Sequence, residues 1–351
     1  MSASWKYVIG YLLVIQLGLG LVVPQRWLYD HRVPYEVFKE DPRIIDLVLD
    51  HIDRQIKRER LTNYVIMLGD SVGYSGPGGP KQSIGYYMEE LSREQGKPLK
   101  VFNLALPAMQ TGDIYVVLLK LRQRGIATDR VIINLLYGGF VARNPDPPIA
   151  FWLADDLAKL DLAAWKRFRE HLARNGRTPD DRSPSALFDR HFAPKISLLA
   201  YRPVLKGQIM KRLKPGAKEV YDTRPWTEKP ELPRILAGYE YQNAFNPAPF
   251  VMTEQNPQIY FLQKIIAHTG ASRPLIYLTP TNQELMKANV SQKGYQENLG
   301  RIDAWFQGKP VTYLNWERSL EDRLFSDHVH LTPEGYRILA EMLLAQLNKR
   351  G

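Results

Sequence analysis

Short apolar segments alternate with helix-like patterns along most of this chain, and this alternation restricts the fold more than any other feature. The segments typical of strands cover residues 64–68, 99–103, 130–136, 274–279 and 310–315. The patterns with helical spacing cover residues 84–95, 114–124, 259–268 and 333–347. Strands that are apolar throughout are typical of parallel sheets covered by helices on both faces. The sequence therefore predicts an α/β fold with a doubly wound, mainly parallel, five-stranded sheet.

The alternation stops between residues 142 and 252, where prolines, aromatic residues and charges follow no strand rhythm. We interpret 142–252 as a large helical insertion that acts as a cap or lid, and 63–141 with 253–351 as the main domain. A basic cluster in the insertion could receive an anionic substrate or form a solvated surface. This cluster consists of Lys206, Lys211, Arg212, Lys214 and Lys218.

An almost unbroken apolar run covers residues 7–23. Its length suits a helix that crosses a bilayer, so we expect a single-pass membrane anchor in residues 1–30. The alternative is a cleaved signal peptide, for which Gly18-Leu19-Gly20 offers a weak cleavage site. Residues 31–62 are predicted to contain an amphipathic juxtamembrane helix, which either packs on the domain or contacts lipid.

The composition limits the partners and the chemistry. The formal net charge of +10 favours acidic partners such as anionic lipid head groups or polyanionic glycans. No zinc-finger spacing, RNP-like motif or long base-reading basic helix is present, so nucleic acid is set aside as a partner. The absence of cysteine excludes disulfides, thiolate metal sites and a cysteine nucleophile. The histidines are scattered, so we expect no metal site and no cofactor.

A Gly-Asp-Ser motif ends at Ser71, directly after the first predicted strand. Ligands of open α/β sheets bind at the carboxyl ends of the strands, which places Ser71 at the binding edge. Asp327 and His330 follow the last predicted strand and belong to the same edge. A serine hydroxyl becomes nucleophilic when a histidine takes its proton and a carboxylate orients that histidine. Taken singly, Ser71 could also be a helix cap and His330 a polar residue near a helix start.

The two motifs, in this order and at these positions, resemble the first and last sequence blocks of the SGNH, or GDSL, hydrolase superfamily. The resemblance covers about residues 64–136 and 274–347. It implies a flavodoxin-like three-layer α/β/α fold. It also implies that Ser71 is the nucleophile, that His330 is the base and that Asp327 orients the base.

The middle blocks of the family are less well matched. Residues 101–108 look like the second block, with Ala108 where the family usually has an oxyanion-hole glycine. An alanine N–H donates equally well if its φ is negative, so Ser71 and Ala108 are expected to supply two backbone donors. Residues 137–140 replace the Gly-x-Asn-Asp of the third block, and Phe140 cannot supply its side-chain amide. Either Asn144 or another group substitutes, or the enzyme is slow toward simple esters.

An N-terminal anchor with a degenerate third block is similar to the membrane-associated SGNH branch, which includes proteins of alginate O-acetylation and teichoic-acid D-alanylation. This resemblance implies serine-dependent acyl transfer, by an O-acyltransferase or esterase, on an envelope glycan or its acyl donor. It also implies a place outside the cytoplasmic membrane and beside a membrane-bound O-acyltransferase. The basic residues after the anchor favour the opposite orientation. The alternatives are a non-catalytic protein that binds a glycan or acyltransferase, and a secreted lipase with the insertion as lid.

Overall fold

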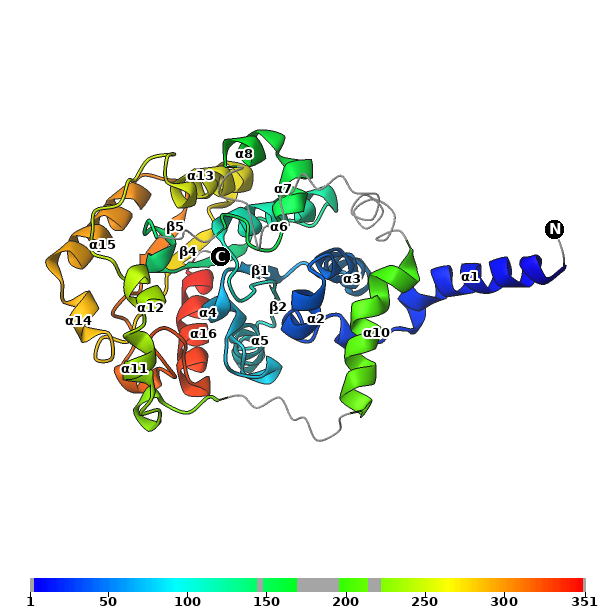
Figure 1. Cartoon of the computed structure of the whole chain (residues 1–351), viewed down its shortest axis with the longest axis horizontal. Coiled ribbons are helices and arrows are strands. Elements are labelled where there is room, and N and C mark those ends of the chain that lie inside the picture. Colours follow the sequence, from blue (N-terminus) through cyan, green and yellow to red (C-terminus); the bar gives the residue numbers. More distant parts are fainter. Residues whose placement is uncertain (1–2, 144–147, 169–195, 214–221, 350–351) are drawn as a thin grey trace.

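A five-stranded parallel sheet forms the centre of the molecule (Figure 1). The computed structural model describes residues 3–143, 148–168, 196–213 and 222–349. The strands are β1 (Tyr64–Leu68), β2 (Lys100–Asn103), β3 (Val131–Leu135), β4 (Leu275–Leu278) and β5 (Thr312–Asn315). Their order is β2-β1-β3-β4-β5, and every neighbouring pair is parallel. This is the order of flavodoxin-like doubly wound sheets, in which ligands bind where the winding reverses between β1 and β3.

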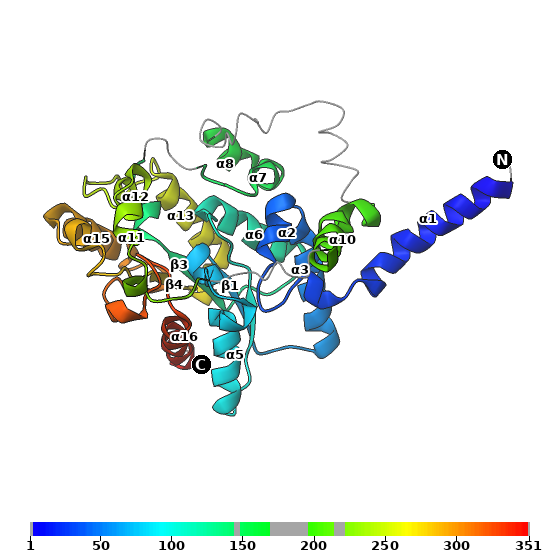
Figure 2. The ribbon, with the colours of Figure 1, turned by 60° about the horizontal axis from the view of Figure 1, so that its bottom comes forward.

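Helices cover both faces of the sheet, as the apolar strands require. The pair α5 (Ile84–Glu94) and α16 (Pro333–Asn348) packs together on one face, and α6 (Thr111–Gln123) packs against α13 (Pro257–Thr269) on the other. Figure 2 shows the two pairs on opposite sides of β1 and β3. All five residues of β3 are buried, which explains why this segment is apolar apart from Asn134. The α/β prediction is therefore confirmed.

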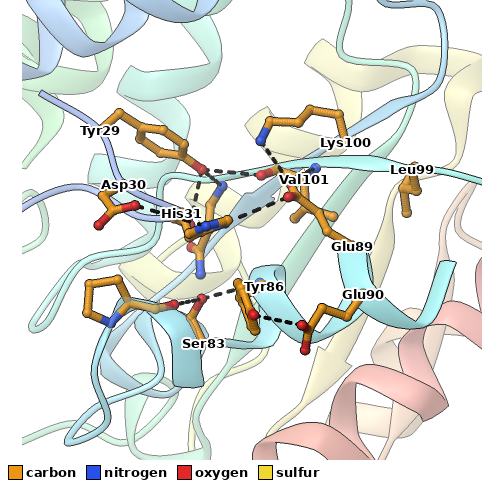
Figure 3. Close-up of polar contacts among 12 residues, drawn as sticks. Tyr29, Asp30, His31, Ser83, Tyr86, Glu89, Glu90, Leu99, Lys100 and Val101 are labelled. Carbon is orange, nitrogen blue, oxygen red and sulfur yellow. Dashed lines mark hydrogen bonds and ion pairs between the residues drawn. The ribbon is translucent and has the colours of Figure 1, made fainter. Parts of the chain in front are cut away.

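The edge strand β2 is covered by side chains rather than by another strand. The hydroxyl of Tyr29 donates to the carbonyl of Val101 at 3.2 Å (Figure 3). The same hydroxyl accepts the N–H of Asn103 at 2.7 Å. The carboxylate of Glu89, on α5, accepts the N–H of Val101 at 2.9 Å and binds Lys100 at 2.8 Å. These bonds satisfy backbone groups that an open sheet edge would otherwise expose. They also fix the chain just after its N-terminal helix to the sheet.

The N-terminal segment forms three helices: α1 (Ala3–Val22), α2 (Tyr35–Glu40) and α3 (Ile44–Glu59). The apolar face of α3 is buried. Its carboxylate Asp46 binds Lys120 of α6 at 2.9 Å, and Asp50 binds Arg124, the residue that caps the end of α6, at 2.7 Å. The amphipathic helix predicted within 31–62 thus packs on the domain. Among the described residues, none of the helices combines the length and the apolar character that crossing a membrane requires.

The described part of 142–252 is helical and spreads over several places on the main domain. Its helices are α7 (Ala154–Leu160), α8 (Leu162–Arg167), α10 (Ser197–Leu213), α11 (Leu232–Leu236) and α12 (Tyr239–Ala244). Figure 1 shows α7 and α8 beside α6 and α13, α10 beside α1, and α11 and α12 on the far side. The remaining helices are α4 (Ser71–Tyr74), α14 (Lys287–Val290) and α15 (Lys293–Phe306). Lys214 and Lys218 of the predicted basic cluster lie outside the described residues.

Candidate active site

The turn after β1 presents Ser71 at the carboxyl edge of the sheet. Ser71 is the first residue of the short helix α4, and Asp70 caps that helix by accepting the N–H of Val72 at 2.9 Å. Gly69, before the cap, has a φ of +148°, a conformation that favours glycine. The glycine and the cap together turn the chain sharply from strand to helix. The side chain of Ser71 stays half-buried at the start of α4.

Ser71, His330 and Asp327 form one continuous chain of hydrogen bonds. Nε2 of His330 lies 2.8 Å from Oγ of Ser71, and Nδ1 of His330 lies 2.7 Å from Oδ2 of Asp327. The side chains of His330 and Asp327 are 21% and 24% exposed, so the acid and base are shielded but reachable. In this arrangement Nδ1 donates to the carboxylate and Nε2 can accept the serine proton. The geometry is that of a serine nucleophile with its base and orienting acid.

Local backbone geometry explains why the three-residue spacing works. Oδ1 of Asp327 accepts the N–H groups of Val329 and His330 at 2.9 and 2.8 Å, which leaves Oδ2 for the imidazole. Thr332 then caps α16 by accepting the N–H of Gly335 at 3.2 Å, and Pro333 occupies the first helical position. The loop that carries Asp327 and His330 is therefore held by the Asp327 turn and by the helix that follows it.

Electrostatic coupling adjusts the acid and the base in opposite directions. Burial by itself raises the pKa of Asp327, but the neighbouring His330 and His328 hold this pKa well below the usual range. Burial lowers the pKa of His330, yet the Asp327 carboxylate outweighs it and raises this pKa above its ordinary value. Both shifts favour an ion pair between a carboxylate and an imidazolium. This is the charge state in which a histidine base is held after it takes a proton from a serine.

Asn134 supports the nucleophile turn, although the sequence reasoning did not single it out. It lies on β3, is 1% exposed, and its Oδ1 accepts the N–H of Asp70 at 3.1 Å. Its Nδ2 donates to Oδ1 of Asp70 at 2.8 Å and to Oγ1 of Thr279 at 3.3 Å. The signal in the sequence was an amide inside the otherwise apolar strand 131–135. Buried amides need partners, so such a residue points to a structural or functional contact.

The predicted role of Ala108 as a backbone oxyanion donor assumed a negative φ, and the structure differs from this assumption. Its φ is +62°, not negative, and it follows Pro107 in a turn closed by the N–H of Met109 on the carbonyl of Leu106 at 3.1 Å. Proline followed by a residue with positive φ is the pattern of a type II turn, which prefers glycine at the second of its two central residues. Alanine is therefore strained there. Among the described residues, the N–H groups of Ala108 and Ser71 donate to no acceptor, so both remain available to an oxyanion.

Residues 137–140, which stand where the SGNH family has its third block, contain no amide side chain. Tyr137–Gly139 form a short 3-10 helix, and Phe140 is buried in the core. A Cβ added to Gly139 would lie 2.9 Å from Nε2 of Gln258, whose Oε1 accepts the hydroxyl of Thr111 at 2.9 Å. The space beside Gly139 is thus already occupied. Asn144, the predicted substitute donor, lies outside the described residues.

Part of the insertion contacts the loop that carries Asp327 and His330, which the sequence did not predict. Lys229, buried at 7% exposure, donates to the carbonyl and hydroxyl oxygens of Ser326 at 3.0 and 2.7 Å. Ser326 directly precedes Asp327. The rings of Tyr241 and Phe245 lie 5.3 and 6.0 Å from the ring of His328, centroid to centroid. The segment around α11 and α12 therefore contacts the loop that carries the acid and the base.

Comparison with solved structures gives a distant structural likeness. No family model matches the chain, and no curated protein matches it. Among solved structures, the chain is similar to a G-D-S-L family lipolytic protein from Desulfitobacterium hafniense DCB-2, with 13% sequence identity and a TM-score of 0.33. The match covers 81% of this chain and 99% of that chain. The likeness is too distant to carry an argument about activity, so the geometry of the site has to carry it.

Proposed function

We propose that this protein is a serine-dependent acyl-transfer enzyme, an O-acyltransferase or an esterase, that works through an acyl-serine intermediate. One observation carries the proposal: the hydrogen-bond chain from Asp327 through His330 to Ser71 joins residues 259 positions apart in the sequence. If Ser71 were only a helix cap, it would not need a histidine partner. If His330 were only a polar residue near a helix start, it would not need a serine partner. Their meeting at the carboxyl edge of the sheet favours nucleophilic catalysis.

The residues divide the reaction into two balanced steps. Oγ of Ser71 attacks the ester carbonyl carbon while Nε2 of His330 takes the hydroxyl proton, and the carbonyl electrons move onto oxygen. When the tetrahedral intermediate collapses, the bond to the leaving alcohol breaks and His330 returns its proton to that oxygen. In the second step His330 deprotonates a sugar hydroxyl or water, whose oxygen attacks the acyl-serine carbonyl carbon. When the second tetrahedral intermediate collapses, the bond between the acyl carbon and Oγ of Ser71 breaks, and His330 gives its proton to Oγ. Asp327 stays ionised throughout and stabilises the imidazolium.

Two backbone donors support the negative oxygen that forms in each step. The N–H groups of Ser71 and Ala108 lack acceptors among the described residues, and the loop of Ala108 lies beside the nucleophile turn, since Leu106 donates to the carbonyl of Gly69 at 3.0 Å. Removing one donor of an oxyanion hole typically costs about 100- to 1,000-fold in rate. The absent amide of the third block is therefore consistent with a slow esterase, or with an enzyme that recovers rate from a specific acceptor.

We propose further that the substrate is an envelope glycan or its acyl donor, and that the enzyme works at the cytoplasmic membrane with its catalytic domain outside. Two observations support this placement: the resemblance of the motif set to the membrane-associated SGNH branch, and the exposed apolar side chains of α1, including Leu17 at 74% and Val22 at 77%. A membrane-bound O-acyltransferase is the proposed partner, since it would supply the acyl group.

A non-catalytic role is the second candidate, favoured by the lack of an amide in the third block. Fluorophosphonate labelling of the full chain, followed by peptide mass spectrometry, separates the two. The enzyme is expected to carry the label on Ser71 and to hydrolyse aryl acetates, whereas the Ser71→Ala variant does neither. An unlabelled wild-type Ser71, with no turnover, would sink the enzymatic proposal. Equal or better turnover of long-chain than of acetyl esters would favour the third candidate, a lipase.

The proposed location has its own test. A reporter that is active only outside the cytoplasm, fused after the last residue, is expected to be active in cells. The matched control is the same fusion on a chain without residues 1–23, which should be inactive. Activity of a cytoplasmic reporter at the same position would overturn the location and the glycan substrate with it.

A further inference from the structure

Exposed large apolar side chains gather on two helices, α1 and α10. Of those that are exposed among the described residues, all but four lie on α1 or within 196–213. The ones in 196–213 are Ile196, Leu198, Ile209, Met210 and Leu213, the last at 71% exposure. Soluble surfaces rarely keep so many apolar groups together, so this concentration marks a contact surface.

Helix α10 is bonded to α1 at the only amide side chain of the apolar run 7–23. The backbone N–H of Ser197 donates to Oε1 of Gln16 at 2.8 Å, and the Ser197 hydroxyl donates to the carbonyl of Gln16 at 2.7 Å. Gln16 is six residues before Val22, the last residue of α1. At 1.5 Å per residue, the start of α10 is therefore about 9 Å from the domain end of α1 along its axis.

The two helices cross instead of running side by side. In Figure 1, α10 lies across the domain end of α1, and Figure 2 shows it at the same junction. The inner side of α10 packs on the domain, where Tyr201 and Val204 are buried and a Cβ on Gly207 would touch Val37 at 3.4 Å. A helix inserted along the bilayer normal would thus hold α10 near the membrane plane, with its outer side directed away from the domain.

The charges of α10 suit an anionic surface. The helix contains Arg202, Lys206, Lys211 and Arg212 and no acidic residue. Arg202 and Arg212 are exposed, on the part of the surface that also exposes Ile209 and Leu213. Lys206 is paired with Glu40 of α2 at 2.6 Å, which fastens α10 to the domain. Exposed apolar groups interleaved with arginines are the pattern of helices that lie in the interface of anionic membranes.

We propose that α10 lies in the membrane interface as an in-plane helix, with Ile209 and Leu213 among the acyl chains and Arg202 and Arg212 on anionic lipid head groups. The inference rests on the proposed membrane attachment through α1. In this role α10 fixes the height of the catalytic domain above the bilayer.

The natural chain has no cysteine, so single cysteines can report depth in the full protein. Ile209→Cys, Leu13→Cys and Ile235→Cys are each labelled with an environment-sensitive fluorophore and bound to vesicles of phosphatidylcholine with phosphatidylglycerol. Ile235, on α11, is an isoleucine 42% exposed on the far side of the domain from α1 and serves as the matched control. Nitroxide-labelled lipids are expected to quench the probes at 209 and 13, and not the probe at 235.

The outcomes separate the two proposals. Quenching at 13 with none at 209 would overturn the role of α10 and leave the attachment through α1 intact, as expected if α10 instead binds a protein. No quenching at either position would overturn both. A charge variant, Arg202→Gln with Arg212→Gln, should weaken quenching at 209 in anionic vesicles and leave quenching at 13 unchanged. Each charge contributes about fivefold to partitioning onto such membranes, so an unchanged signal would contradict the head-group contact.

Discussion

The amide oxygen of Asn134 occupies the space that a side chain on Gly69 would need. A Cβ added to Gly69 would lie 1.6 Å from Oδ1 of Asn134, and one added to Gly73 would lie 2.3 Å from the same atom. The oxygen is held there by the N–H of Asp70 at 3.1 Å. Two glycines and one buried amide, on β1's turn and on β3, therefore shape the turn that presents Ser71.

Replacing Asn134 by leucine is expected to disturb the nucleophile without touching substrate. The N–H of Asp70 loses its acceptor, and an unsatisfied buried group costs about 1–3 kcal/mol. The Asp70 carboxylate loses one donor but keeps the N–H of Val72. We expect a lower free energy of unfolding and a lower kcat with little change in KM, measured by denaturant titration and ester kinetics. Thr279→Val, which removes only the 3.3 Å contact, is the control. Unchanged kcat in the Asn134→Leu variant would refute the positioning role.

Gly73→Ala tests the steric part of the same relationship. The added methyl group meets Oδ1 of Asn134, so we expect a loss of about 1–3 kcal/mol in unfolding free energy from overpacking. In the Asn134→Ala background this loss should shrink, with a coupling energy of about 0.5–3 kcal/mol in a double-mutant cycle. Gly300→Ala is the matched control, because this helical glycine has open space around it and alanine favours helix. Additive losses would show that the contact is not the cause.

The raised pKa of His330 predicts how activity depends on pH. Catalysis needs the neutral imidazole, so kcat/KM should rise with pH, with a midpoint above the ordinary histidine value of about 6.5. Asp327→Asn removes the charge that raises this pKa, so the midpoint should fall and kcat should drop on the order of 10,000-fold. A midpoint that stays put in this variant would mean that another group titrates.

The Asp327–His330 ion pair should stabilise the folded state between a lower and an upper pH limit, and this stabilisation should be lost below the first and above the second. The pKa of Asp327 is depressed in the folded state, so its contribution is present above about pH 4 and is lost as the pH falls. The pKa of His330 is raised, so its contribution is complete below about pH 6.5 and is lost as the pH rises through the folded value. Denaturant titrations of wild type and Asp327→Asn across this range should show the largest difference between the two limits.

Lys229→Met is expected to move the pH profile in the opposite direction. The Lys229 ammonium group lowers the pKa of His330, so its removal should raise the midpoint of kcat/KM. Ser326 also loses two donors, which should cost about 1–3 kcal/mol of stability. Lys206→Met, at an exposed pair with Glu40 on α2, is the control and should leave the midpoint unchanged. A lowered midpoint in Lys229→Met would exclude this electrostatic effect.

Ala108→Gly is expected to stabilise the protein. Alanine at a φ of +62° costs about 1–2 kcal/mol relative to an allowed conformation, and glycine avoids most of this cost. Ala105→Gly, in the same loop and buried without a positive φ, is the control and should destabilise. Thermal unfolding measures both variants. Because the backbone N–H is kept, the glycine variant should retain its activity, and a loss of stability would contradict the strained turn.

The elements of the fold could be predicted from the sequence because each depends on local patterns. The apolar runs placed all five strands within about two residues, and Pro333 marked the first residue of the last helix. Ser71, Asp327 and His330 could be identified as candidate site residues from the sequence, because a serine after a strand and an acid three residues before a histidine are short-range signals. The sign of φ at Ala108 could not be predicted from the sequence, because it depends on how the turn after Pro107 closes.

The Gly-Asp-Ser turn, the Asp-x-x-His segment and the alternation of strands and helices were determined by the sequence alone, since their physical basis lies within a few residues. Tertiary structure decided that the serine and histidine meet, because β3 and β4 lie between β1 and β5 in the sheet, and the chain after β5 has to return toward β1 before His330 reaches Ser71. It also decided the roles of Asn134 and Lys229. Their partners are many positions away, and long-range packing of buried polar groups leaves no spacing that a sequence can show.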